Sequence, residues 1–592
     1  MVSFFSSSSS SSSSAVPFSK RHLLTPRWKR DVPKGTEWVT NIVKYGNKEY
    51  AGILGKGNKF ESPTEEDELT EVLQQKNEIS ETYVVQTSKE KRKTLVEMFF
   101  ASFCLATDGY ITSCTNTLNG GLQATYGPQY THSIAIQNIS AIGSAGMIVS
   151  MLFFGVLSDW IGRKKVTLAG NAIMIIFSLL LAGAYTKGTQ TKPTADRYYL
   201  DDSTGTHYPV APSSLWSYIT FLRFMVGIGI GSEYPGAASW ATDISKKLPP
   251  KSRNMWIILF TCSAIDVGFF LGALVVFIII CIVGEDRYIY VWRWATGFGA
   301  LLSSFFFFGR LHVKESDAFE RNRFKGKIPY WKALKFYWYR IIIFSIPWFC
   351  FDLSCYGFGS TSSLIIELIL GDGAKQKQVW AYNMMFQAFQ IVGSVAGSDI
   401  ASRFGIRYSC ATASFIQGGI GLVLYFCLDD LKKNVAGFAA CFSLYQAIGN
   451  IGFGNNTLLF SSAGFATPVR GGMFSICSAV GIIGGLTSGY IFPKLVVTGG
   501  TRSTFLLGAI LCLASAIIIL FAPPLDQVTQ QLEDKRFMEY LEAEGYDITQ
   551  LTAHDYIHDQ EKNVVEVVEE ESVSELEKDC KVEVTQETDS KL

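Results

Sequence analysis

The chain has 592 residues, and its 52 basic side chains balance its 52 acidic ones, so the formal net charge is zero. This neutrality argues against a nucleic-acid partner, which favours a basic excess. Hydrophobic residues make up 48% of the chain, as they also can in a large soluble protein. Their distribution does not fit a soluble protein, because charged residues are concentrated in both tails and in short loops and are nearly absent from the middle of the chain.

The N-terminal stretch, residues 1–94, is polar and carries a run of serines from Ser6 to Ser14. Basic residues follow the run, and no acid precedes Asp31. We expect a disordered cytosolic tail here, with at most a short helix near residues 63–76. A mitochondrial transit peptide, which is also rich in serine and basic residues and poor in acids, is the alternative.

The middle of the chain contains about a dozen apolar stretches of roughly 20 residues, the length that an α-helix needs to cross a bilayer. They predict an all-α polytopic membrane protein with twelve transmembrane helices. The predicted spans are 96–118, 134–157, 165–185, 215–238, 254–283, 291–312, 341–368, 380–401, 408–428, 435–461, 471–497 and 504–523.

The basic residues predict the orientation, because cytosolic loops carry an excess of Lys and Arg. Such residues follow the second and fourth spans and fill the connection at 313–340, whereas the opposite loops lack net positive charge. We therefore expect both termini and this connection in the cytosol. The connection separates two six-helix bundles, 95–312 and 341–523. A cytosolic acidic tail, residues 524–592, follows and begins with an amphipathic helix near 526–545.

Eleven of the twelve cysteines lie within or beside apolar segments, and none has metal-ligand spacing in a polar loop. We interpret them as buried small hydrophobes. The chain also has no nucleophile elbow and no P-loop. The sequence therefore favours neither an enzyme nor a cofactor or metal site.

Four acids stand inside apolar stretches: Asp108, Glu233, Asp266 and Asp352. An ionised carboxylate at mid-membrane costs about 2.5 kcal/mol or more, so it normally faces a protein interior or a watery path. Many helices around a few buried acids are typical of a proton-coupled carrier. We expect these four acids to take part in proton coupling.

A glycine-rich motif lies between the second and third spans and contains Gly155, Asp159, Gly162, Arg163 and Lys164. Glycine permits a tight turn between helices, and the aspartate can cap a helix or pair with a nearby cation. The motif resembles the signature loop of the major facilitator superfamily. The resemblance covers about residues 95–523 and implies a two-bundle fold with alternating access.

The second half carries a weaker copy of this motif after the eighth span, between Gly397 and Arg407. Ser402 stands where the first copy has its aspartate. A charge clasp at the second copy is therefore doubtful.

The fourth span contains Arg223, a run of alternating glycines, and then Glu233, Tyr234 and Pro235. It resembles the fourth helix of the phosphate:proton symporter family, in which Glu at this place is typical of the fungal glycerophosphodiester branch. The resemblance implies that Glu233 and Tyr234 shape the substrate site. A structural pair between Glu233 and Arg223 is disfavoured, because ten residues span about 15 Å along a helix.

The seventh span places Trp348, Asp352 and Tyr356 on one helical face, because they are four residues apart. They resemble the residues that line the substrate site in the same symporters; an aromatic packing stripe with a stray acid is the alternative. Residues 328–338 resemble the segment that precedes this helix in fungal glycerophosphoinositol and glycerophosphocholine permeases.

Two further matches concern Asp108 and the pair Asn455 and Asn456. Asp108 stands in a D-G-Y motif whose acid is linked to proton movement in the family, and the asparagines match a substrate-contacting region. A helix–helix hydrogen bond is the alternative for the asparagines. Asp266 matches nothing in the family.

The chain departs from the phosphate carriers in the eleventh span, where Ile482 stands in place of a lysine and, nearby, Ala463 in place of an acid. We count four interior acids against one interior base, Arg223. Ionised acids would repel inorganic phosphate but not a zwitterion, and aromatic faces also bind a quaternary ammonium. Glycerophosphocholine is therefore preferred to glycerophosphoinositol.

The sequence thus predicts a multi-pass plasma-membrane symporter that imports a glycerophosphodiester together with protons. Its partners would be a small-molecule substrate, protons and the lipid bilayer. Three alternatives stay open: a carrier of inorganic phosphate, a carrier of an unphosphorylated organic solute, and a nutrient sensor that does not transport.

Overall fold

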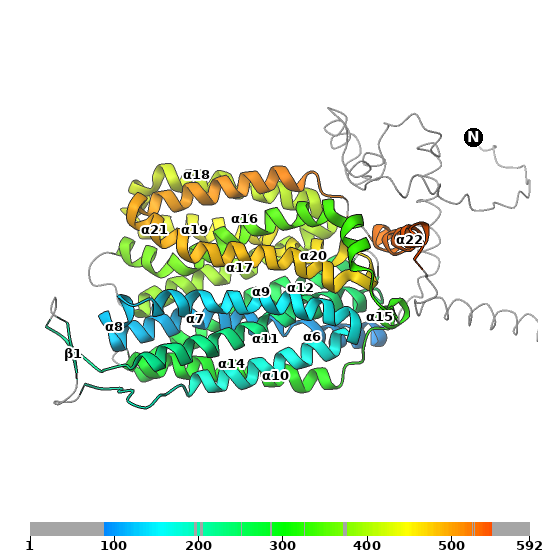
Figure 1. Ribbon diagram of the computed structural model, residues 1–592. Coiled ribbons are helices and arrows are strands. Elements are labelled where there is room, and N and C mark those ends of the chain that lie inside the picture. The colour runs from blue at the N-terminus through cyan, green and yellow to red at the C-terminus, as the bar shows by residue number, and fades with distance from the viewer. Residues whose placement is uncertain are drawn as a thin grey trace, which may run out of the picture.

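A computed structural model describes residues 88–193, 198–201, 205–249, 252–284, 287–324, 326–370, 376–523, 525 and 527–546. The predicted features of the N-terminal tail, including the short helix near 63–76, lie outside these residues, as does the acidic tail after residue 546. The described part is a set of long helices that run side by side (Figure 1).

The first half of the chain forms six membrane-length helical segments, two of which are broken by a short non-helical step. The breaks fall at residues 103–104, between α6 and α7, and at Thr261, between α12 and α13. The helices are α6 (Ser88–Ser102), α7 (Leu105–Tyr126), α8 (Pro128–Thr131), α9 (Ala135–Ile161), α10 (Arg163–Ala182), α11 (Ser213–Ser245), α12 (Arg253–Phe260), α13 (Cys262–Val283) and α14 (Tyr288–Leu311).

The second half repeats this pattern after the short helix α15 (Asp317–Asn322). Its longest helix, α21, contains a kink at Gly500, whose φ of 69° is non-helical, so α21 provides two membrane-length segments. The helices are α16 (Tyr330–Leu370), α17 (Gln376–Phe404), α18 (Ile406–Lys432), α19 (Val435–Gly449), the π-turn η3 (Asn450–Gly454), α20 (Asn455–Ala463), the 3₁₀ turn η4 (Thr467–Val469), α21 (Arg470–Ile519) and α22 (Gln527–Ala543).

Every predicted span falls on a helix, which confirms the all-α polytopic class. Within the described residues, ten helical segments are long and apolar enough by composition to cross a membrane. The predicted spans 291–312 and 380–401, on α14 and α17, do not meet that criterion although both helices are long. A helix, α22, lies where the sequence predicts an amphipathic helix near 526–545.

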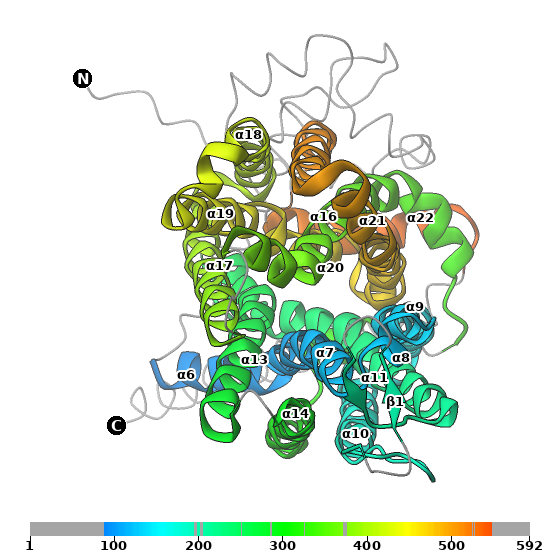
Figure 2. The same cartoon turned by 90° about the vertical axis from the view of Figure 1, so that its left-hand side faces the viewer.

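The helices form two groups that face each other, α6–α14 on one side and α16–α21 on the other (Figure 2). Helix α9 packs against α21, and α13 packs against α17, across the boundary. The short hairpin β1 (Tyr199–Leu200) and β2 (His207–Tyr208) lies with α8 at one end of the bundle, and α15 and α22 lie at the other (Figure 1). We name these the β1 end and the α15 end.

Glycines allow the two groups to touch closely near the α15 end. A Cβ atom built on Gly155 of α9 would collide with the side chain of Ser475 on α21, and one built on Gly471 would collide with Ser158. Gly162, which starts the turn into α10, has a φ of 107°, a conformation that glycine adopts without strain. The glycines of the predicted motif therefore bring α9 and the start of α21 into backbone contact.

Candidate substrate cavity

A cavity of about 1370 Å³ lies between the two groups of helices and takes its lining from both. Its lining residues on α9 end at Met147 and those on α17 end at Gln390, although both helices continue toward the α15 end. On α7 the lining runs from Thr112 to Ala124, in the half nearer the β1 end. The cavity therefore reaches toward the β1 end and stops short of the α15 end. It exceeds the roughly 300–1,000 Å³ of common ligand pockets, so a small polar solute fits together with water.

Charged side chains are few in this cavity. Among the described residues, its lining includes two acids and two bases: Asp266, Asp352, Arg223 and Lys494. The predicted count of one interior base is wrong, because Arg163, Arg310, Arg340 and Arg470 are also fully or almost fully buried. Sequence alone could not pair these arginines with acids on other helices. Within the cavity lining itself, the two signs of charge are balanced.

Three of the predicted substrate residues form one cluster on α16. Trp348, Asp352 and Tyr356 all line the cavity, and Trp348 hydrogen-bonds the Asp352 carboxylate. The other carboxylate oxygen, Oδ2, has no hydrogen-bond partner in the described part of the chain. Tyr234 of α11 joins the cluster from the opposite half through a hydrogen bond to Tyr356. An acid with a free oxygen, surrounded by aromatic rings, suits either a proton or an organic cation.

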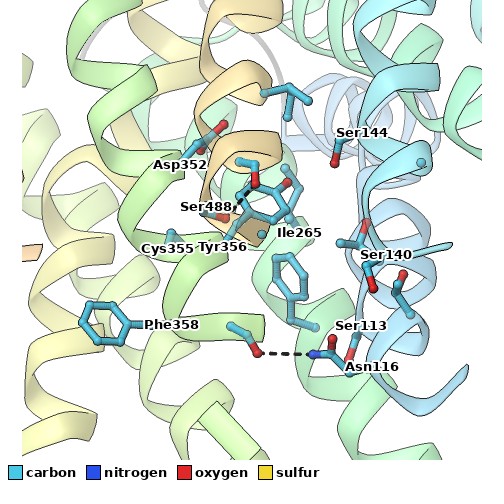
Figure 3. Close-up of a pocket in the computed structure, with 18 of the residues that line it drawn as sticks. Ser113, Asn116, Ser140, Ser144, Ile265, Asp352, Cys355, Tyr356, Phe358 and Ser488 are labelled. Atoms are coloured by element: carbon cyan, nitrogen blue, oxygen red, sulfur yellow. Dashed lines mark hydrogen bonds between the residues drawn. The ribbon is translucent and has the colours of Figure 1, made fainter. Parts of the chain in front are cut away.

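Figure 3 shows this cluster facing a second wall. Asp352, Cys355 and Tyr356 lie on one side, and Ser140 and Ser144 of α9 lie across the cavity from them. Asn119 of α7 donates a hydrogen bond to Ser140 Oγ at 2.8 Å. The second wall is therefore polar but uncharged apart from Arg223.

Asp266 also lines the cavity, from α13. It interacts with Ser394 of α17 and Asn450 of η3, so it links the two halves. Ser263, on the same helix, lies 2.7 Å from Ser394 between the hydroxyl oxygens. Asp266 is thus held by hydrogen bonds in the boundary that must rearrange if the halves rock.

Asp108 and Glu233 do not line the cavity but lie behind it in the first half. Glu233 Oε1 accepts a hydrogen bond from Arg310 of α14 at 2.6 Å, and both side chains are fully buried. Asp108 has electrostatic contact with Glu233 and Arg310, yet both of its carboxylate oxygens lack a hydrogen-bond partner among the described residues. Tyr234 has electrostatic contact with Asp108 as well as Asp352 and so stands between this trio and the cavity.

The two predicted asparagines lie outside the cavity lining. Asn455 donates from Nδ2 to the Ser394 carbonyl at 2.6 Å and accepts the Ser394 hydroxyl at 2.5 Å. Asn456 donates to the Gly452 carbonyl at 2.6 Å, beside the π-turn. In this conformation both side chains make helix-to-helix or local contacts, and Asn450, one turn earlier, lines the cavity instead.

Sequence reasoning missed the polar side chains of α17 that line the cavity, namely Asn383, Gln387 and Gln390. They are spaced four and three residues apart and therefore share one helical face. The signal was available, because their polarity lowers the hydropathy of this helix below that of a typical span. A row of amide side chains on one face of a predicted span therefore indicates that this face lines a water-filled cavity.

The α15 end is closed by buried ion pairs around the predicted glycine-rich motif. Asp159 accepts backbone N–H bonds from Gly471 at 2.9 Å and Gly472 at 2.7 Å, and so caps the start of α21 in the opposite half. Arg163 lies 3.3 Å from Asp159 and 3.4 Å from Asp243. Asp243 of α11 also pairs with Arg470 of α21, and all four side chains are fully buried. This network ties the two halves together.

Helix α22 adds a second layer at the same end. Asp534 accepts bonds from the backbone N–H of Thr467 at 2.7 Å and from its hydroxyl at 2.9 Å. Lys246, at the end of α11, lies 3.4 Å from Asp534. Glu533 pairs with Arg340 at 3.1 Å. The helix therefore contacts both halves through charged side chains.

Lys164 and Glu315 complete this closed end. The backbone N–H of Lys164 donates to the Glu315 carboxylate at 3.0 Å, and its ammonium donates to the Leu311 carbonyl at 2.9 Å. Burial raises the pKa of Glu315 above its ordinary value, against the opposing effect of the Lys164 N–H.

The comparisons with known proteins agree with this geometry. Residues 95–326 and 369–528 match the sugar (and other) transporter family. The chain is 33% identical over 482 residues to a glycerophosphodiester transporter of Candida albicans, covering 79% of this chain and 86% of the relative. It is 33% identical over 472 residues to a glycerophosphocholine permease of the same organism, covering 78% and 84%. The solved structure of a proton:xylose symporter superimposes with a TM-score of 0.60 at 15% identity, covering 74% of this chain and 99% of that one.

Two opposed helix bundles around a central cavity define a multi-pass membrane transporter with the major facilitator fold. This chain belongs to the sugar (and other) transporter family.

Proposed function

We propose that this protein is a proton-coupled symporter that imports a glycerophosphodiester, glycerophosphocholine in preference to glycerophosphoinositol. The observation that carries the proposal is Asp352, a nearly buried cavity acid with a free oxygen between Trp348 and Tyr356. A carboxylate among aromatic rings binds a quaternary ammonium through charge and cation–π contact. The similarity to glycerophosphodiester and glycerophosphocholine permeases supports the same substrate class.

The balanced cavity lining supports a zwitterion. Two acids and two bases face the cavity, so a substrate with one charge of each sign leaves the site neutral. A dianion such as inorganic phosphate would add two uncompensated charges to a partly desolvated space, which is costly.

Asp108 is proposed as the main proton site. Arg310 hydrogen-bonds Glu233, so one cation serves two acids in the core of the first half. The acid without a bonded cation is Asp108, and a buried carboxyl in that position is stabilised by carrying a proton. Tyr234 would connect this proton site to Asp352 and the substrate. Protonation and substrate binding would then shift the equilibrium between two conformations.

The basic residues support an orientation in the membrane. We propose that the α15 end, where the positively charged connection lies, faces the cytosol, with both termini on that side. The conformation described above is then open toward the outside and closed toward the cytosol. An importer of a solute from the medium belongs in the plasma membrane, and we propose that location.

The test is uptake by the purified protein in lipid vesicles. Labelled glycerophosphocholine, glycerophosphoinositol, inorganic phosphate and choline would be offered with and without an outside-acid pH gradient. We expect diester uptake that the gradient drives above equilibrium and that a protonophore collapses. Uptake of phosphate or free choline alone would contradict the proposed substrate, and binding without uptake would favour a sensor.

Asp108→Asn tests the proton site. The variant keeps the size of the side chain but cannot cycle a proton, so we expect exchange of diester to persist while gradient-driven accumulation is lost. The matched control is Asp430→Asn, which alters an exposed acid that pairs with Lys433 and is not among the residues lining the cavity. Accumulation that survives in Asp108→Asn would contradict this assignment.

A further inference from the structure

Arg223 differs from the four most deeply buried arginines of the described residues, which are 0–1% exposed. It lies on α11, is 6% exposed and lines the cavity. Arg163, Arg310, Arg340 and Arg470 each pair with a carboxylate. Arg223 has no carboxylate partner anywhere in the described part of the chain.

The contacts of Arg223 leave its terminal nitrogens available. Its Nε donates to the Ile139 carbonyl at 3.5 Å, at the long limit of a hydrogen bond. Neither terminal nitrogen makes a hydrogen bond to a described residue, and neither is sealed from the cavity. Its electrostatic neighbours are the thiol of Cys114 and the phenol of Tyr130, neither of which is a carboxylate.

The backbone of α9 makes room for this guanidinium. A methyl group on Gly143 would lie 3.0 Å from Nη2 of Arg223, closer than ordinary packing allows. Ser140 and Ser144 flank that glycine on the wall that faces Asp352 and Tyr356 (Figure 3). The setting is therefore one cation among neutral hydrogen-bonding groups.

A buried cation without a counter-ion is unfavourable, so an anion that enters this cavity gains both charge neutralisation and charge-assisted hydrogen bonds. The planar fork of a guanidinium matches two oxygens of a phosphate, which a lysine ammonium cannot match in the same way. The neighbouring serines and Asn119 can bond the hydroxyls of a glycerol.

We infer that Arg223 is the receptor for the phosphodiester group, and that the substrate lies across the cavity with its phosphate on the α9–α11 wall and its headgroup toward Asp352. This inference rests on the proposed function and assigns a substrate role to a residue for which the sequence analysis gave none. Lys494 lines the cavity too, but it is an exposed residue of α21 and does not belong to the α9–α11 wall.

The proposed orientation of the substrate predicts that two variants change the KM values of the two diesters differently in the vesicle uptake assay. Every glycerophosphodiester shares the phosphate, so Arg223→Gln raises the KM for glycerophosphocholine and glycerophosphoinositol alike, by about tenfold or more. Only glycerophosphocholine carries the ammonium, so Asp352→Asn raises the KM for glycerophosphocholine selectively. Arg223→Lys keeps the charge without the fork and has an intermediate effect on both.

Arg502→Gln is the matched control. It removes an arginine at the turn of α21 near Gly500 that pairs with Asp429 at 2.7 Å outside the cavity, and its KM values stay at the wild-type level. Correct folding of each variant is checked by size-exclusion chromatography. If Arg223→Gln does not fold, the decision falls to Arg223→Lys, which must raise both KM values.

Two results would overturn the inference. One is wild-type KM for both diesters in Arg223→Gln, or in Arg223→Lys where that variant decides. The other is a variant in which the pH profile of uptake changes while glycerophosphoinositol competes with glycerophosphocholine as well as it does in the wild type. Arg223 would then be a positioning residue for proton transfer. Failure of the proposed function is distinguishable, because the wild-type protein itself would then take up no diester.

Discussion

The two ends of the boundary between the halves are built from different interactions. At the α15 end, Asp159, Arg163, Asp243 and Arg470 form buried ion pairs with no exposed surface. At the β1 end, two hydrogen bonds that cross the boundary are Asn116 to the Gly359 carbonyl at 3.2 Å and Trp380 to Tyr288 at 3.0 Å. The interactions that join the two halves are therefore strong at the α15 end, where they are ionic, and weak at the β1 end, where they are neutral.

This difference explains how one structure can be closed on one side and open on the other. Breaking a buried ion pair leaves an uncompensated charge and costs about 3–5 kcal/mol, whereas a neutral hydrogen bond contributes about 1 kcal/mol. Opening the α15 end is therefore costly, and we propose that ligand binding and protonation supply the energy. The β1 end can open and close by thermal motion.

The largest effect is expected from Asp243→Asn, which removes the shared partner of Arg163 and Arg470. A loss of about 3 kcal/mol shifts the equilibrium toward the conformation open at the α15 end by more than about a hundredfold. The measurement is maleimide labelling of a cysteine placed at Ser462, which is fully buried at the closed end.

The control for this prediction comes from the second copy of the glycine-rich motif. Asp399 pairs with Arg403 at 2.8 Å, but the two side chains are 49% and 70% exposed. Surface pairs contribute about 0–1 kcal/mol, so Asp399→Asn should leave labelling almost unchanged. Equal labelling in the two variants would remove the distinction between the copies.

A smaller effect is expected from Asp534→Asn in α22. The variant weakens two hydrogen bonds to Thr467 and the pair with Lys246, which is partly exposed at 21%. We expect labelling at Ser462→Cys to rise by about tenfold, since hydrogen bonds to a charged group contribute about 1.5–3 kcal/mol. Unchanged labelling would mean that α22 does not hold the closed end.

A still smaller effect, at the other end of the boundary, is expected from Trp380→Phe at the β1 end. The change removes the ring N–H that donates to Tyr288 but keeps an aromatic ring, so it costs about 1 kcal/mol, or about fivefold. A cysteine at Gln387 in the cavity should become more reactive to a maleimide added from the β1 side. Reduced reactivity would show that this contact does not restrict the mouth.

The smallest effect concerns pH at the α15 end. Burial raises the pKa of Glu315 above its ordinary value of 4.5, so closure favours the protonated carboxyl. Its contribution to closure is complete below pH 4.5 and is lost as the pH rises through the raised pKa. Glu315→Gln should flatten this dependence of Ser462→Cys labelling, and an unchanged slope would assign it to another group.

The fold was accessible from sequence because most of the membrane helices carry their own signal in length and hydropathy. The cluster of Trp348, Asp352 and Tyr356 was accessible for a similar reason, since its spacing lies within one helix. The partner of Glu233 was not, because Arg310 comes from a helix 77 positions away. Only the packing of helices reveals that Asp159 caps α21 and that Arg223 has no carboxylate beside it.

The most direct test of alternating access is a reversible disulfide cross-link between the two halves at the closed end. The hydroxyls of Thr242 on α11 and Ser462 on α20 lie 2.9 Å apart, so cysteines at both positions can form a disulfide between the halves. We predict that the oxidised double variant binds glycerophosphocholine from the β1 side but does not transport it, and that reduction restores uptake. Wild-type uptake by the fully cross-linked protein would contradict the account.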